Sequence, residues 1–326
     1  MKPFQCIKQN KYVKRTIHII FLLATVAVID LALGNLLENF YFKQKSGWLY
    51  RTTYALNETT ADLVIIGSSR ANHHYHPEVL SKNLNLTYYN AGRDGSYIFY
   101  HYAVIRSILK RYKPKVIIFD FIKTGFKPSQ ESYDRTAYLL PYYRSHPELR
   151  DIIETKSTFE KIKLLSRIYP YNSMLVTIAA GHPALHSTRD GDNKGFIPLL
   201  DKWNEPLVSY KASPCYDFDK KEVSIYESIL SDCKKSGIQL YVVVSPYYYK
   251  HESPDCSVVE ARKIAAKYNV PFFDFGENQY FLDKPYLFDD SYHLNENGAR
   301  VFSAQLVEAI KQEESKTYAF QSNLDQ

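Results

Sequence analysis

The sequence of 326 residues contains few cysteines, and their spacing carries no metal-binding pattern. Cys6 lies near the N-terminus, whereas Cys215, Cys233 and Cys256 lie far apart in the C-terminal half. None of them forms the close Cys-x-x-Cys pair that is typical of zinc sites, so neither a metal nor another cofactor is expected. Because the last three are an odd number, at most one disulfide can form among them. The sequence does not indicate which pair forms it.

The chain also lacks an arginine-rich arm or a basic stripe. Its formal net charge of +6 is mild, so nucleic acid is not an expected partner. Hydrophobic residues make up 45% and charged residues 23%, which is typical of a folded protein. The unusual feature is the aromatic content, with 29 Tyr and 18 Phe. Tyrosine lines carbohydrate sites but also packs ordinary cores, so contact with a glycan is only suggested.

The N-terminus predicts a membrane anchor. Residues 1–15 carry five basic residues and no acid, and Ile17–Leu33 is almost wholly apolar. As a helix, residues 16–34 span roughly 28 Å, about one bilayer core. The basic flank is expected to stay in the cytoplasm, which places the rest of the chain outside the cytoplasmic membrane. Two alternatives are a signal peptide cleaved near residues 32–34 and a buried helix of a soluble protein.

Apolar runs then alternate with segments of helical periodicity. This alternation predicts a parallel sheet with right-handed crossovers, arranged as a flavodoxin-like three-layer α/β/α sandwich of about five strands. The predicted strands are 61–67, 85–90, 115–121, 238–245 and 270–274, and the longer predicted helices are 97–112 (capped by Ser96), 219–236, 255–268 and 295–312.

The alternation of predicted strands and helices stops in mid-chain. Residues 122–218 show no clean strand–helix alternation, and we interpret them as an insertion that covers an edge of the sheet. The predicted organisation is a cytoplasmic tail (1–15), a transmembrane helix (16–34), a connector (35–60), one α/β domain (61–313) that contains the insertion, and a C-terminal tail (314–326).

The candidate catalytic residues lie at the end of the first predicted strand and in the last loop of the predicted sheet. Ser69 follows the apolar strand that stops at Gly67, and the carboxyl edge of an open α/β sheet is where ligands bind. A serine nucleophile needs a base and a group that orients this base. His293 is the predicted base, and Asp290, three residues earlier, is the predicted carboxylate. The Gly-x-Ser-x-Gly elbow of α/β-hydrolases is absent.

These motifs resemble the SGNH (GDSL-like) hydrolase superfamily, in its membrane-anchored envelope branch. Gly67-Ser-Ser69 is similar to the nucleophile block, Asn90-Ala-Gly-Arg-Asp-Gly95 to the second block, and Asp290-Ser-Tyr-His293 to the last block. The resemblance covers roughly residues 61–121 and 219–313 and implies ester chemistry on the same sandwich fold. It also implies an oxyanion hole formed by the amides of Ser69 and Gly95.

The chain differs from that family in the third conserved block. In place of Gly-x-Asn-Asp the chain reads Phe119-Asp-Phe-Ile-Lys-Thr-Gly125, without the asparagine that would donate to the oxyanion. Arg70 or a group from the insertion is a candidate replacement. Candidate substrate-binding residues are Arg70, Asn90 and Tyr247.

Each of these residues also has a purely structural interpretation. Ser69 can be a helix cap, Gly95 a turn residue, and Asp290 with His293 a surface turn. Asp289 is the alternative carboxylate, Arg70 can be an ion-pair partner, and Tyr247 can belong to a packed loop. Neighbouring histidines raise the question of a metal, but adjacent loop histidines point in different directions and no carboxylate is spaced to join them. These histidines are His73, His74 and His76.

The sequence therefore predicts a membrane-anchored extracytoplasmic serine esterase or O-acyltransferase. Its expected substrate is an acyl ester of an envelope glycan or a related polymer, with envelope-assembly proteins as further candidate partners. The alternative is a weakly active or inactive protein that keeps the fold and binds glycan or acts as an assembly scaffold.

Overall fold

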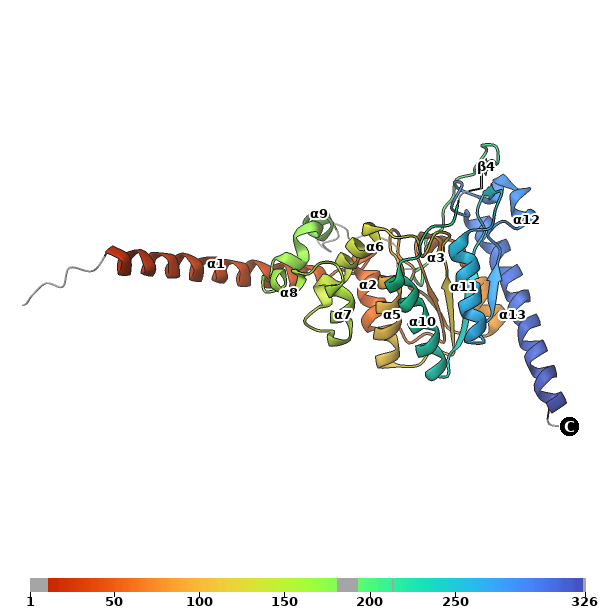
Figure 1. Cartoon of the computed structure of the whole chain (residues 1–326), viewed down its shortest axis with the longest axis horizontal. Helices are drawn as coiled ribbons and strands as arrows, with labels where there is room; N and C mark the ends of the chain where they lie inside the picture. The colour runs from red at the N-terminus through yellow and green to blue at the C-terminus, as the bar shows by residue number, and fades with distance from the viewer. Residues whose placement is uncertain (1–10, 181–192, 213, 325–326) are drawn as a thin grey trace, which may run out of the picture.

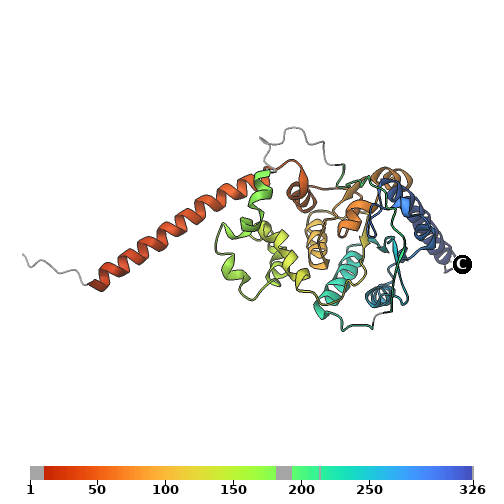
Figure 2. The same cartoon turned by 90° about the horizontal axis from the view of Figure 1, so that it is seen from above.

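The computed structural model describes residues 11–180, 193–212 and 214–324 (Figure 1). Its N-terminal helix, α1 (Lys11–Phe42), projects as a single long rod from the α/β domain (Figures 1 and 2). By length and composition α1 could cross a membrane, and most of its side chains are exposed. Helix α1 is longer than the predicted span of residues 16–34, and Cys6 with the first part of the basic flank lies outside the described residues.

The domain is built on a five-stranded parallel sheet, which confirms the predicted fold class. The strand order is β2-β1-β3-β5-β7, and every neighbouring pair is parallel. The strands are β1 (Leu63–Ile66), β2 (Tyr88–Asn90), β3 (Val116–Asp120), β5 (Gln239–Val244) and β7 (Phe272–Asp274), each shorter than predicted.

Helices cover both faces of this sheet. Successive side chains of a strand point to opposite faces, so Val64 and Ile66 enter one hydrophobic core while Leu63 and Ile65 enter the other. The first core also receives α2 (Gly47–Asn57), α5 (Ile98–Arg111), α10 (Lys220–Lys235) and α11 (Cys256–Lys267). The second receives α3 (Ser69–His74), α4 (Pro77–Leu84) and α13 (Glu296–Leu324). Two layers of helices on one sheet give the predicted three-layer sandwich.

Three predicted segments differ in the structure. Residues 35–60, expected to be a connector, contain the end of α1 and all of α2, whose Leu49 and Leu56 are buried against the core. The expected tail after residue 313 continues α13 to Leu324. Ser96 does not cap α5, because Tyr97 is the N-cap residue and the Ser96 hydroxyl donates to the carbonyl of Arg93 (2.6 Å).

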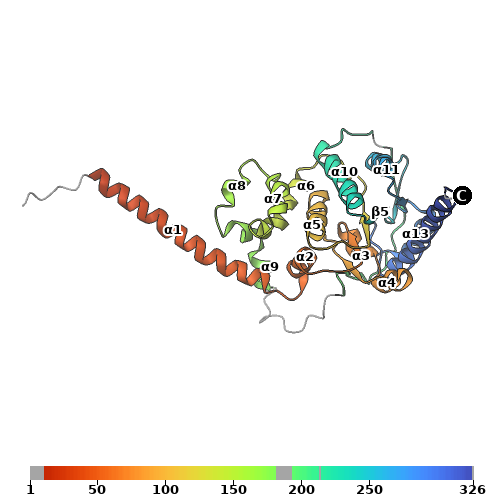
Figure 3. The same cartoon turned by 90° about the horizontal axis from the view of Figure 1, so that it is seen from below.

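The first half of the mid-chain insertion is helical and lies beside α1, α2 and α5 (Figures 1 and 3). Its elements are α6 (Gln130–Asp134), η1 (Arg135–Tyr142), η2 (Pro147–Leu149), α7 (Arg150–Glu154), α8 (Glu160–Lys163), η3 (Tyr169–Met174) and α9 (Leu175–Ala180).

The second half of the insertion returns along the carboxyl edge of the sheet. The amide of Asn90 donates to the carbonyl of Lys194 (2.8 Å), and that of Trp203 donates to the carbonyl of Phe288 (2.8 Å). Strand β4 (Val208–Tyr210) then pairs with β6 (Tyr249–His251) beside the end of β5. The remaining short elements, α12 (Gln279–Leu282) and η4 (Pro285–Leu287), precede the loop that carries His293.

Candidate active site

Ser69 is held at the carboxyl end of β1 by a turn that requires glycine. Gly67 has a φ of +157°, and a Cβ atom on it would lie 2.7 Å from the Ala71 Cβ and 2.9 Å from the Asp120 Cβ. Ser68 is the N-cap residue of α3, and Ser69 is the first residue of this helix. The absence of a side chain at Gly67 thus allows α3 to start against the end of β3, with the Ser69 hydroxyl at the edge of the sheet.

Ser69, His293 and Asp290 form one hydrogen-bonded chain. The Ser69 Oγ lies 2.8 Å from the His293 Nε2. The His293 Nδ1 lies 2.9 Å from Asp290 Oδ2 and 3.1 Å from Asp290 Oδ1. A proton on Nδ1 satisfies the carboxylate and leaves Nε2 free to accept the proton of the serine hydroxyl. The structure therefore brings all three predicted residues together, in the order that proton transfer from a serine requires.

The Asp290 carboxylate is fixed by its own loop. Its Oδ1 accepts hydrogen bonds from the amides of Tyr292 (2.6 Å) and His293 (2.9 Å). Partial burial raises the pKa of this carboxyl. The hydrogen bond and charge of His293, together with the two amides, outweigh the effect of burial and hold the pKa below its ordinary value. Asp290 is therefore ionised at neutral pH and oriented toward the imidazole.

Asp289, the alternative carboxylate, points elsewhere. Its Oδ1 accepts a hydrogen bond from the amide of Asp201 in the returning half of the insertion (3.0 Å). Asp289 thus ties the insertion to the loop, whereas Asp290 contacts the ring of His293.

The loop that follows β2 lies against the nucleophile turn. The amide of Arg93 donates to the carbonyl of Gly67 (3.1 Å). Gly95, two residues later, has a φ of +63°, in the left-handed region that glycine adopts without strain. A Cβ at this position would meet nothing closer than 3.5 Å, so the backbone conformation rather than space favours glycine there. Tyr138 and Arg135 of η1 lie beside it.

Arg70 is a buried structural residue and not an open substrate clamp, contrary to one of the two interpretations above. Its guanidinium donates to the Ser245 hydroxyl (2.7 Å), to the Ser245 carbonyl and to the Pro246 carbonyl (3.3 Å). It pairs with Asp120 at 3.6 Å and stacks 3.3 Å above the ring of Tyr247. Arg70 thus joins α3 to the ends of β3 and β5, beneath the nucleophile.

The candidates Asn90 and Tyr247 are likewise committed to the fold. The Asn90 side chain donates to the Ala71 carbonyl (2.7 Å) and accepts from the Gly92 amide (2.9 Å), and the residue is 1% exposed. The Tyr247 hydroxyl accepts from the amide of Lys123 (3.0 Å), while Arg70 covers its ring. Both residues brace loops of the site. Asn90 does not line the cavity beside Ser69, whereas Tyr247 does, so substrate contact by Tyr247 stays a prediction.

The departure in the third block is visible at the end of β3. The amide of Lys123 donates to Tyr247, and the amide of Thr124 donates to Asp255 (3.1 Å). These amides are therefore occupied within the fold. These two amides therefore do not replace the missing asparagine as oxyanion donors. Among the described residues, Arg70 keeps its Nε without a hydrogen-bond partner and lines the cavity beside Ser69, so its role as a replacement donor stays a prediction.

The neighbouring histidines have separate partners. His73 Nδ1 contacts the Ile197 carbonyl (2.8 Å), and His76 Nε2 lies 3.8 Å from Glu296. His74 lies between Ser245 and the amide of Leu294. Within the described ranges, no group of three or more His, Cys, Asp or Glu residues is arranged to hold a metal ion.

Comparison with known proteins gives distant structural similarity to solved structures. No protein-family model matches this chain, and no curated protein matches it. Among solved structures, the crystal structure of an acetyl xylan esterase, AlAXEase, is similar with a TM-score of 0.38 and 13% sequence identity, over 76% of this chain and 98% of that chain.

A cavity of about 470 Å³ opens beside Ser69 and His293. Its walls include Tyr210 from the insertion and Tyr292 from the His293 loop, which are 43% and 48% exposed. Tyr249 lies between them, with ring centroids 5.6 Å from Tyr210 and 5.3 Å from Tyr292. We call Tyr210, Tyr249 and Tyr292 the tyrosine wall. Tyr292 lies within the predicted Asp-Ser-Tyr-His motif, whereas nothing in the sequence indicated that Tyr210 would reach the site.

A lysine side chain also lines the cavity. Lys123 is nearly buried, with its Nζ 2.7 Å from Glu277 Oε1 and 4.4 Å from the centroid of the Tyr249 ring. Burial lowers the pKa of this ammonium group, and the pairing with Glu277 opposes the shift. Because Glu277 compensates the charge, Lys123 adds little net attraction for an anionic substrate.

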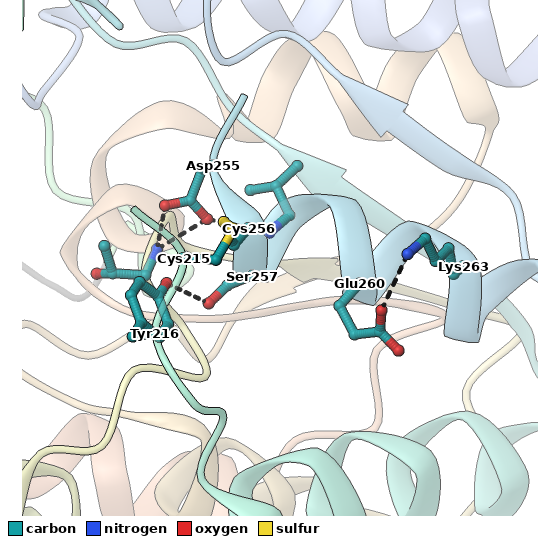
Figure 4. Close-up of a disulfide and its surroundings, with 9 residues drawn as sticks. Cys215, Tyr216, Asp255, Cys256, Ser257, Glu260 and Lys263 are labelled. Carbon is teal, nitrogen blue, oxygen red and sulfur yellow. Dashed lines mark hydrogen bonds and ion pairs between the residues drawn. A yellow bond between two sulfur atoms is a disulfide. The ribbon is translucent and has the colours of Figure 1, made fainter. Parts of the chain in front are cut away.

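A disulfide fastens the chain next to the tyrosine wall. Cys215 is bonded to Cys256 at the start of α11 (Figure 4). Cys233 is a buried free thiol. Around the disulfide, Tyr216 and Ser257 share a hydrogen bond (2.6 Å), and Asp255 caps α11 through the amide of Val258 (3.0 Å). The bridge ties the segment that follows β4 to a helix of the domain core, close to where Tyr210 enters the cavity.

Proposed function

We propose that the protein is a serine esterase or O-acyltransferase of the SGNH type. The observation that carries this proposal is the hydrogen-bonded chain from the Ser69 hydroxyl through His293 to Asp290. Ser69 and His293 are 224 residues apart in sequence, and a chance surface turn does not assemble a nucleophile, a base and an orienting carboxylate in this order.

The mechanism follows from these contacts. The Ser69 Oγ attacks the carbonyl carbon of the acyl ester while the His293 Nε2 takes the hydroxyl proton. The Asp290 carboxylate stabilises the imidazolium that forms. The negative charge on the carbonyl oxygen is accepted by backbone amides, for which we assign Ser69 and Gly95. Collapse of the tetrahedral intermediate breaks the bond to the alcohol, which leaves with the proton from His293.

The second half of the reaction returns the enzyme to its first state. His293 removes a proton from an acceptor hydroxyl, whose oxygen attacks the acyl group on Ser69. Release of the Ser69 oxygen, which regains the proton from His293, completes the cycle. Water as acceptor gives hydrolysis, and a sugar hydroxyl gives acyl transfer.

Two features support an acyl ester of an envelope glycan as the substrate. The tyrosine wall offers exposed rings beside the nucleophile, and aromatic faces with polar edges suit sugar rings. Helix α1 supports a location outside the cytoplasmic membrane, attached by a single span.

Contacts at the outer end of α1 favour a retained anchor over a cleaved signal peptide. The Asp30 carboxylate accepts hydrogen bonds from the Ser166 hydroxyl (2.5 Å) and from the amides of Arg167 (2.6 Å) and Ile168 (3.2 Å). Cleavage near residues 32–34 would remove this contact with the folded domain.

A second candidate function, glycan binding without turnover, is favoured by one observation. The amides of Lys123 and Thr124, which follow β3, are taken up within the fold, and loss of a single oxyanion donor elsewhere costs ~10²–10³ in rate. Under this alternative the same cavity binds an acylated glycan and holds it without cleavage.

A fluorophosphonate probe tests the proposal, because it labels only an activated serine. The full chain in detergent should be labelled, and both Ser69→Ala and His293→Ala should abolish the label. Ser68→Ala is the matched control, because Ser68 precedes the nucleophile and has no contact with His293 among those that the structure describes. A wild-type protein that binds acylated glycan but never takes the label would establish the second candidate instead.

A further inference from the structure

The helical half of the insertion carries apolar side chains on its outside. Phe159 and Ile162 are each 64% exposed, and Leu165 is 78% exposed. On α9, Leu175 is 46% and Val176 83% exposed. We call these five residues the insertion patch.

Helix α8 buries its acidic residue and exposes both apolar and basic side chains. Glu160 is 1% exposed and accepts hydrogen bonds from the hydroxyls of Tyr169 (2.5 Å) and Ser157 (2.7 Å). Phe159 and Ile162 on the other side have no comparable cover. The exposed side chains of Lys161 and Lys163 stand on either side of Ile162, and basic residues beside exposed apolar ones suit the interface of a membrane.

The insertion patch lies beside α1. Helices α8 and α9 flank the end of α1 that enters the domain (Figures 1 and 3), and α9 contacts α1 directly. The loop after Leu165 bonds to Asp30 through Ser166, Arg167 and Ile168. Gly34 is so close to this loop that a Cβ on it would lie 2.2 Å from the Cβ of Arg167.

These contacts show where the patch lies along the axis of α1. Asp30 and Gly34 are separated by roughly 6 Å along the helix axis. Exposed apolar side chains of α1 continue beyond this level to Leu36, which is 47% exposed. The patch therefore lies level with the outer end of the apolar part of α1.

We propose that the insertion patch enters the interface of the outer leaflet next to α1. The domain then rests on the membrane at two places, the spanning helix and the patch, and its orientation relative to the bilayer is fixed. Apolar side chains at the depth of the headgroups and upper acyl chains are stabilised by removal from water. This inference rests on the part of the proposed function in which α1 spans the membrane.

Spin-label accessibility tests the inference in the full chain. In a Cys6→Ser background, the remaining cysteines are a disulfide and a buried thiol. Single cysteines at Ile162, Leu165 and Val176 are labelled with a nitroxide, and the protein is reconstituted in nanodiscs of phosphatidylcholine and phosphatidylglycerol. Leu23 on α1 is the control in the bilayer. Leu200, an exposed leucine (76%) remote from α1, is the matched control in water.

Oxygen dissolves in lipid, whereas a nickel chelate stays in water. Labels at the three patch positions should collide several-fold more with oxygen relative to the nickel chelate than the Leu200 label does. If they match Leu200 while the Leu23 label is in lipid, α1 spans and this inference is overturned. If the Leu23 label is also in water, the anchor itself fails together with the inference. If the patch labels become shielded only after another protein is added, the patch binds a protein partner, and the inference is also overturned. Fluorophosphonate labelling of the same samples reports the esterase proposal independently.

Discussion

The imidazole of His74 accepts a hydrogen bond from the amide of Leu294 (3.0 Å), the residue directly after His293. Its other nitrogen lies 2.9 Å from the Ser245 hydroxyl. His74 is the last residue of α3, the helix that Ser69 begins. One side chain thus connects the helix of the nucleophile with the loop of the base, and it does so without contacting substrate.

The first prediction concerns this connection. His74→Leu leaves the buried amide of Leu294 without an acceptor, which costs ~1–3 kcal/mol in the free energy of unfolding. The loop of His293 should shift, so kcat for a small acyl ester should fall while KM changes little. His74→Gln, which keeps an acceptor at the same depth, should retain more activity than His74→Leu. If both variants keep wild-type kcat, His74 does not position the base.

The second prediction concerns pH and stability. Complete burial lowers the pKa of His74 well below its ordinary value, and the charge of Arg70 adds to this effect. Above pH ~6.5 His74 is neutral in both the folded and the unfolded chain and has no effect on stability. Below that pH the unfolded chain binds a proton that the folded chain excludes, so the free energy of unfolding falls as pH decreases.

Chemical denaturation of wild type and His74→Gln between pH 5 and 8 checks the sign. The stability difference between them should be constant above pH ~6.5 and should shift in favour of His74→Gln below it. A difference that is flat across the range would show that His74 takes up a proton equally in both states.

Much of the fold could be predicted from the sequence, and the reason lies in the sheet. Strands buried on both faces are continuous apolar runs, so buried strand residues such as Val64 and Val242 can be recognised from the sequence. Ser69 follows the end of one such run, and His293 lies in the last loop of the sheet, which is why the two residues could be paired across the chain.

What could not be predicted depends on tertiary contacts. Arg70 and Asn90 are polar residues next to a nucleophile, and only the packed structure shows that Ser245 and Ala71 take up their hydrogen-bonding groups. The approach of Tyr210 depends on the path of a long insertion without regular alternation.

The third prediction separates the two neighbouring aspartates. Asp290→Asn should lower kcat by ~10²–10⁴, because the amide no longer stabilises the imidazolium and can hold the ring in the wrong tautomer. Asp289→Asn should change kcat little, since an asparagine oxygen still accepts from the Asp201 amide. The pair is compared by steady-state hydrolysis of p-nitrophenyl acetate. The assignment of Asp290 is wrong if Asp289→Asn is the more damaging change.

The fourth prediction concerns the tyrosine wall. Tyr210→Ala and Tyr292→Ala should each raise KM for an acylated oligosaccharide by roughly 3- to 10-fold through loss of ring stacking. Neither should affect hydrolysis of p-nitrophenyl acetate, which is too small to need the wall. Tyr286→Ala is the control, because Tyr286 is similarly exposed (52%) but does not line the cavity. Equal losses on both substrates would mean that these tyrosines support the catalytic residues rather than bind sugar.

The fifth prediction concerns the bridge between Cys215 and Cys256, which closes a loop across 41 residues of sequence. In its absence the unfolded chain gains conformational freedom, so Cys215→Ser/Cys256→Ser should lose ~2–4 kcal/mol in the free energy of unfolding. The segment next to β4 is then released from α11, and Tyr210 loses its fixed place in the wall. The variant should therefore show a higher KM for the oligosaccharide with kcat for p-nitrophenyl acetate preserved. In a Cys6→Ser background, dithiothreitol should reproduce both effects with the bridge present and add nothing in the double variant, because Cys233, the thiol that then remains, is buried and unpaired. If reduction lowers the unfolding temperature without any change in KM, the bridge stabilises the fold but does not hold the wall.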